Sequence, residues 1–212
     1  GACEGNDMPP GGVEMKLVFL GTSGSMPTER RGSCSAVLKV GRDLIMFDCG
    51  EGTQRQMVRA RVGFRRNMVV LVSHLHGDHV LGLPGLLQTM SLLGREKQLD
   101  IYGPAGLISY VKAFSEALGG PTFPVILHEV QDPGVVYEDD GLRVTAAASS
   151  HTLEGWSYSV LEKPRPGRFH PAKARALGVP EGPLWHKLQH GEDVEVDGRV
   201  VEPGMVADPP RR

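Results

Sequence analysis

Short apolar runs alternate with stretches of helical spacing between residues 15 and 147. Runs rich in β-branched residues predict strands, at 15–20, 34–40, 44–47, 68–73, 99–102, 125–130 and 142–147. Stretches with helical spacing that end near a glycine or a loop predict helices, at 53–61, 82–93 and 105–118. Strands that alternate with helices in this way predict a layered α/β domain.

The composition changes after Val160, where proline, glycine and charged residues become frequent. Two short helices are predicted there, each with proline near its start and glycine after its end, at 170–177 and 182–190. We expect residues 162–206 to be an insertion that projects from a core of residues 15–161. The polar residues 1–14 are expected to be a disordered leader, and residues 207–212 the start of a further core segment.

The composition is that of an ordinary globular protein, with 40% apolar and 23% charged residues. No apolar run approaches the roughly 18 residues that cross a bilayer, so no membrane partner is expected. Three cysteines without a CxxC pair favour a reducing, cytoplasmic location. The net charge of −2 gives no global signal for nucleic acid.

The chemistry concentrates in one segment directly after the buried strand 68–73. Three histidines and an aspartate follow within six residues: His74, His76, Asp78 and His79. A loop at a strand exit can bring all four side chains to one point, and Gly77 permits the bend. Imidazole and carboxylate ligands suit zinc. Three histidines with an aspartate between them favour a metal site over a polar turn whose histidines are only solvated or capping. This segment therefore predicts a metal site.

His151 follows the strand 142–147 and also lies at a strand exit. Functional groups of α/β folds gather at such exits. A histidine in a turn rich in serine and threonine is often structural, so its position alone leaves both roles open. Asp48, at the end of another predicted strand, is expected to hydrogen-bond a ligand histidine.

The segment 73–79 matches the HxHxDH signature of the metallo-β-lactamase superfamily. Within it, the chain resembles ribonuclease Z, the endonuclease that trims tRNA 3′ ends. The resemblance extends from residue 15 to 212 and rests on four motifs, which are 19–31, 47–56, 73–87 and 177–192. The first departs from the family at Gly32, where asparagine is usual. The last motif is similar to the family's protruding arm, which holds the tRNA away from the active site, so the resemblance implies that residues 162–206 are a tRNA-binding arm. The second motif and this arm separate the family from β-lactamases and glyoxalases.

The resemblance implies an αβ/βα four-layer sandwich with two zinc ions, which would activate water and neutralise charge on a phosphodiester. His74, His76 and His151 would bind the first ion, and Asp78 and His79 the second. Asp78 is also expected to handle a proton. The implied reaction is endonucleolytic removal of the 3′ trailer from precursor tRNA by a homodimer.

The family continues beyond the point where this sequence stops. The continuation holds a further strand, a Gly-Asp-Thr turn and a later metal-binding histidine. We therefore expect the second sheet and the second metal site to be incomplete here. The chain alone is predicted to bind one metal well and a second weakly, and to cleave poorly.

Local basic patches agree with an RNA substrate. Residues 55–66 contain five arginines and no acid, and residues 162–190 contain six Lys or Arg against two acids. Such side chains bind phosphates without reading sequence, although charge runs are often only solvated surface. The candidate RNA-binding residues are Arg55, Arg59, Lys163, Arg165, Arg168, Lys173, Arg175 and Lys187. Trp185 is expected to anchor the insertion rather than stack on a base.

Two other functions remain open at this point. The same metal site could hydrolyse a small phosphodiester or ester, or the chain could be a catalytically inactive RNA-binding fragment. Removal of residues 163–201 would separate tRNA cleavage from hydrolysis of a small substrate, and metal analysis combined with a turnover assay separates the inactive fragment from both enzymes.

Overall fold

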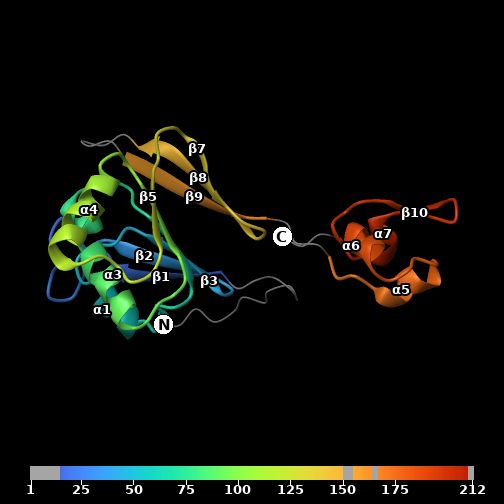
Figure 1. Ribbon diagram of the computed structural model, residues 1–212, viewed down its shortest axis with the longest axis horizontal. Coiled ribbons are helices and arrows are strands. Elements are labelled where there is room, and N and C mark those ends of the chain that lie inside the picture. Colours follow the sequence, from blue (N-terminus) through green and yellow to red (C-terminus); the bar gives the residue numbers. More distant parts are fainter. Residues whose placement is uncertain (1–14, 150–154, 164–166, 210–212) are drawn as a thin grey trace. The chain divides into compact units, whose positions relative to one another are not determined.

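The computed structural model describes residues 15–149, 155–163 and 167–209 (Figure 1). These residues form two compact units. Within the described ranges, the larger unit runs from residue 15 to 138 and includes 144–160, while the smaller contains 139–143 and the chain from residue 161 onward.

The larger unit is built on a six-stranded sheet whose strands follow the order of the sequence. The strands are β1 Met15–Gly21, β2 Ser35–Val40, β3 Asp43–Phe47, β4 Asn67–Leu71, β5 Leu99–Gly103 and β6 Val125–Glu129. The pairs β1–β2 and β2–β3 are antiparallel, and the later neighbours are parallel. A short turn suffices for the β2–β3 hairpin, whereas parallel neighbours need long crossovers. The helices therefore lie in the crossovers that join β3 to β4, β4 to β5 and β5 to β6.

Helices from the crossovers cover one face of this sheet (Figure 1). They are α1 Thr53–Arg59, α3 Gly82–Leu92 and α4 Leu107–Leu118, and the short α2 Gly77–Val80 precedes α3. Alternate strand residues such as Met46 and Val70 join Leu86 and Met90 of α3 in one buried cluster. Each fully buried side chain of this kind contributes about 1.5–3 kcal/mol. This cluster holds the ends of β3 and β4 in place.

A second sheet has the strand order β7-β8-β9. Its strands are β7 Gly134–Glu138, β8 Leu142–Ser149 and β9 Gly155–Glu162. The two sheets are joined directly, because the Tyr158 hydroxyl donates to the carbonyl of Val72 at 2.9 Å and the Tyr137 ring meets that of Tyr102 edge-on. Only β8 of these three strands was predicted from the sequence. The side chain of Asp139 accepts from two backbone N–H groups and holds the turn before β8.

The other face of β1 carries exposed apolar side chains. Val18 and Leu20 pack on the helix side of the sheet, so alternation places the intervening residues on the opposite face. There Leu17 is 50% exposed and Phe19 67% exposed. β1 is the first strand in the order of the sheet, so this apolar surface lies at an edge.

The smaller unit has its own apolar cluster. Its elements are α5 Pro171–Ala176, α6 Pro183–Gln189, β10 Val194–Val196, β11 Arg199–Val201 and α7 Pro203–Val206. Both α5 and α6 begin with proline, and glycines with positive φ follow them, as the sequence predicts. Six buried residues form the cluster, namely Ala174, Val179, Leu188, Val194, Val201 and Val206. None of the helices in the described part of the chain is long and apolar enough to span a bilayer.

Candidate metal centre

The segment that follows β4 is fixed by backbone hydrogen bonds from three directions. Val72 N–H donates to the Tyr102 carbonyl of β5, and the Ser73 carbonyl accepts from Trp156 N–H of β9. The carbonyl of His79 accepts from Cys49 N–H at 2.7 Å. A side chain at Gly50 would meet the backbone oxygen of Asp78 at 2.3 Å, so this approach requires glycine.

The four ligand candidates of this segment lie side by side. Nε2 of His74 is 2.9 Å from Nδ1 of His76, and the ring centroids of His74 and His79 are 4.1 Å apart. Nε2 of His79 lies 3.5 Å from Oδ2 of Asp78. The short turn of α2 turns Asp78 and His79 back toward the two preceding histidines. The structure thus brings together four of the five predicted ligands.

The fifth predicted ligand, His151, lies outside the described residues. Its role as a ligand stays a prediction.

Asp78 is positioned by a distant loop. Its Oδ2 accepts the backbone N–H of Ser25 at 2.7 Å, and Ser25 has the left-handed φ of 54°. Partial burial alone would raise the pKa of Asp78, but the hydrogen bond from Ser25 and the nearby His79 outweigh it and lower the pKa. The carboxylate is therefore kept in its charged, metal-binding form. Sequence reasoning did not find Ser25, because only the folded chain brings it to residue 78.

Asp48 contacts His79 and Ser73 and is buried, with 7% of its surface exposed. Its Oδ1 accepts Ser73 N–H at 2.7 Å, and its Oδ2 lies 2.7 Å from Nδ1 of His79 and 3.0 Å from the Ser73 hydroxyl. The hydrogen bond with Asp48 raises the pKa of His79. It also leaves Nε2 of His79 directed toward Asp78. This is the contact expected of Asp48 from the sequence.

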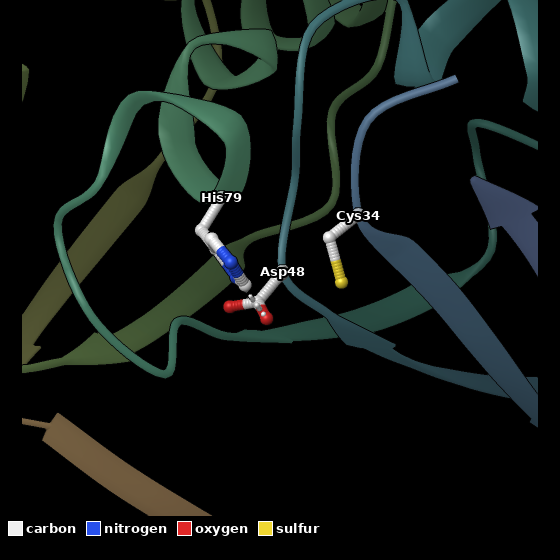
Figure 2. A group of neighbouring side chains, drawn as sticks. All are labelled: Cys34, Asp48 and His79. Atoms are coloured by element: carbon white, nitrogen blue, oxygen red, sulfur yellow. Dashed lines mark hydrogen bonds and ion pairs between the residues drawn. The ribbon is translucent and has the colours of Figure 1, made fainter. Parts of the chain in front are cut away.

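Cys34 lies next to the same carboxylate. Figure 2 shows the His79 ring directed at Asp48 with the Cys34 side chain beside them, and the ligand atoms of the three residues lie within 4.8 Å of one another. Both Asp48 oxygens already accept hydrogen bonds. Burial raises the pKa of the Cys34 thiol, and the charges of Asp48 and Asp78 raise it further. Since thiolate is the metal-binding form, we do not assign a metal to this trio.

The neighbouring histidine and aspartate atoms fit a metal ion better. Zinc–nitrogen bonds are about 2.0–2.1 Å, so two tetrahedral ligands of one ion lie about 3.3 Å apart. The distances of 2.9 Å between His74 and His76 and 3.5 Å between His79 and Asp78 bracket this value. The donor set of imidazole nitrogens and a carboxylate oxygen is also the one that zinc and similar ions prefer.

The basic residues of the larger unit have two different environments. Arg55 and Arg59 of α1 are exposed. By contrast, Arg65 donates to the Leu93 carbonyl and Arg66 to the Arg42 carbonyl, so these two side chains tie loops together. The patch 55–66 is therefore only partly available to a ligand.

The basic residues of the smaller unit also differ among themselves. Arg168, Lys173 and Lys187 are exposed, whereas Arg175 pairs with Glu181 and its guanidinium lies 5.4 Å from the Trp185 ring centroid. Trp185 donates to the Val179 carbonyl, as an anchoring role requires. Lys163 is half-buried, and its backbone N–H donates to the Gly141 carbonyl at 2.8 Å. Arg165 lies outside the described residues.

Comparisons with known proteins give a family model and a set of curated relatives that carry different names. A family model described as "Anti-Pycsar protein Apyc1" matches residues 15–121, which is 107 of 212 residues. A ribonuclease Z from Methanosarcina acetivorans is 46% identical over 198 residues, which cover 93% of this chain and 65% of that protein. The chain belongs to the family that this model describes, and the curated relatives to which it is similar are named ribonuclease Z. It spans about two thirds of the length of the curated relatives it matches.

Solved structures give the same fold. The short form of human tRNase Z is 31% identical, with a TM-score of 0.65 over 70% of this chain and 66% of that one. The Bacillus subtilis protein YhfI, described as a metallo-β-lactamase fold protein, has a TM-score of 0.56 at 17% identity, over 76% of this chain and 66% of that one. The chain has the metallo-β-lactamase fold, as the resemblance in the sequence predicted.

Proposed function

We propose that this chain carries the metal centre of a zinc-dependent endoribonuclease that removes the 3′ trailer from precursor tRNA. The observation that carries the proposal is the placement of Nε2 of His74 and Nδ1 of His76 at 2.9 Å from each other, beside Asp78 and His79. The name of the curated relatives, ribonuclease Z, supports the choice of reaction and substrate.

We assign metal binding and positioning to different residues of the site. We assign His74, His76 and His151 to one zinc ion, and Asp78 and His79 to a second. Zinc bound there supplies Lewis acidity that activates water and stabilises charge on phosphate oxygens. Asp48 keeps the proton of His79 on Nδ1, and Ser25 keeps the Asp78 carboxylate charged. Asp78 is also the group that we propose to handle a proton.

Residues 162–206 are proposed as the arm that binds tRNA. Arg168, Lys173 and Lys187 are exposed cations of this segment, and such side chains supply affinity through phosphate contacts. We also propose a homodimer and a cytoplasmic location, on the grounds given by the sequence. The phosphate contacts of the arm do not require base recognition, which suits an enzyme that processes many different tRNAs.

Charge reversal in the arm tests the substrate. The double variant Lys173→Glu, Lys187→Glu should lower cleavage of a precursor tRNA by about tenfold or more at low salt, and the loss of phosphate contacts should make cleavage less salt-dependent. Hydrolysis of a small chromogenic phosphodiester should stay unchanged. The matched control, Glu195→Lys on the exposed hairpin of the same unit, should not lower tRNA cleavage.

Other results would overturn the proposal. Hydrolysis of the small phosphodiester without any tRNA cleavage would favour a small-substrate hydrolase. Full zinc loading with turnover of neither substrate would favour an inactive RNA-binding protein.

A further inference from the structure

Ser73 lies between Asp48 and two of the ligand histidines. We infer that Ser73 is a positioning residue whose hydroxyl connects the Asp48 carboxylate to His74, so that one buried carboxylate sets the ring orientation and tautomer of both His74 and His79. This inference rests on the metal site of the proposed function. It concerns how the protein prepares that site before any ion or RNA binds.

The contacts of Ser73 are held in place from both sides. Its N–H donates to Oδ1 of Asp48 at 2.7 Å, and its carbonyl accepts from Trp156 N–H at 2.8 Å. Its hydroxyl oxygen lies 3.0 Å from Oδ2 of Asp48, 2.9 Å from Nδ1 of His74 and 3.3 Å from Nδ1 of His79. The backbone is anchored on both sides, and the three contacts of the hydroxyl itself place it among these atoms.

The positions of the protons follow from the number of donors. A carboxylate only accepts hydrogen bonds, so the 2.7 Å contact with Oδ2 of Asp48 requires a proton on Nδ1 of His79. The Ser73 hydroxyl has one proton to donate. If that proton pointed at His74, the hydroxyl oxygen and the Asp48 oxygen would meet at 3.0 Å as two acceptors. The favourable arrangement is donation from Ser73 to Asp48 and from Nδ1–H of His74 to Ser73.

This arrangement decides which nitrogen of each ring can bind a metal. With protons on both Nδ1 atoms, the lone pairs of His74 and His79 are on Nε2. Nε2 of His74 is the atom that faces Nδ1 of His76 at 2.9 Å, and Nε2 of His79 is the atom that faces Asp78. Asp48 acts on His79 directly and on His74 through Ser73. Removing the hydroxyl should therefore affect His74 and leave His79 in its tautomer.

The first test is the tautomer state of the metal-free protein. Long-range ¹H–¹⁵N spectra distinguish a protonated from an unprotonated ring nitrogen, and a His74→Gln variant assigns the signals of His74. Well above the ordinary imidazole pKa of about 6.5, wild-type His74 should carry its proton on Nδ1. Ser73→Ala should give a mixture of tautomers at His74, while His79 keeps Nδ1–H. Asp48→Asn should disturb both rings.

The second test is zinc affinity, measured by competition with a chromophoric chelator. Loss of a residue that orients a ligand typically weakens metal binding by about 10–100-fold, and we expect this of Ser73→Ala. Ser73→Thr keeps the hydroxyl and should bind zinc nearly as tightly as the wild type. Melting curves of the two variants show whether the fold is intact.

Each outcome decides the inference. An unchanged His74 tautomer or an unchanged zinc affinity in Ser73→Ala overturns it, as does a Ser73→Thr variant that is as weak as Ser73→Ala. If the tautomer and affinity results agree with the expectation but no protein cleaves precursor tRNA, the positioning role stands and the proposed reaction fails.

Discussion

The metal centre and the smaller unit use charged side chains in opposite ways. In the metal centre, Asp48 is 7% exposed and accepts three hydrogen bonds, and Asp78 is held by Ser25. In the smaller unit, Lys173 and Lys187 are exposed on short helices. Metal chemistry needs ligands fixed to within about 0.5 Å, whereas phosphate contacts mainly need charge. For the proposed function, the contrast predicts that catalysis and substrate affinity can be changed separately.

The largest expected effect is the loss of a ligand in the metal centre. His76→Ala should abolish zinc binding at the site shared with His74 and raise the barrier of phosphodiester hydrolysis by about 4 kcal/mol, which slows the reaction about a thousandfold. Metal analysis and a hydrolysis assay measure the two effects. His128→Ala is the control, because His128 contacts Asp100 and stacks on Tyr102 and is not one of the proposed ligands. Unchanged zinc content in His76→Ala would remove this residue from the site.

Glycines give a matched comparison of packing in the two units. A side chain at Gly82 would meet the Gly50 backbone oxygen at 2.0 Å, whereas nothing lies within 4 Å at Gly204 of α7. Gly82→Ala should reduce the free energy of unfolding by about 3 kcal/mol, because backbone must move. Gly204→Ala should be neutral or stabilise by up to about 1 kcal/mol. Urea unfolding of both variants measures the difference, and equal effects would contradict it.

The smallest effects are expected at two basic residues of α5. Arg175→Ala removes an exposed ion pair with Glu181 and should cost about 1 kcal/mol or less. It should leave tRNA affinity nearly unchanged, because its guanidinium already pairs with Glu181. Lys173→Ala should weaken tRNA binding. It should also reduce, by about one, the slope of the logarithm of tRNA affinity against the logarithm of salt concentration. Binding titrations at several salt concentrations test this. A larger loss of tRNA affinity in Arg175→Ala than in Lys173→Ala would contradict the assignment of Lys173 as the phosphate-binding residue.

Much of the first sheet and its helices could be predicted from the sequence. Apolar runs mark β1 to β6, and each observed end lies within two residues of the predicted one. The strands β7 and β9 were missed, because β9 alternates serine with its buried or half-buried residues and the apolar run of β7 is only the three residues from Val135 to Tyr137. Tertiary contacts with Val72 and Tyr102 stabilise these strands, and no local pattern records them.

The site could be predicted only where its residues are close in sequence. His74 to His79 form one motif, and Asp48 was found because it ends a neighbouring strand. The contact of Ser25 with Asp78 spans 53 residues through an irregular loop, so pattern reasoning could not find it. Residue type alone does not distinguish Arg55, which is exposed, from Arg65, which donates to the Leu93 carbonyl, so the RNA-binding role of Arg55 and Arg59 stays a prediction.

The most direct test of the account is the position of the metal itself. Crystals of the protein soaked in zinc should give an anomalous difference peak at the zinc absorption edge, about 2.0–2.1 Å from Nε2 of His74 and Nδ1 of His76. A map with no peak among these histidines, or with its peak on other residues, would contradict the assignment of the metal centre.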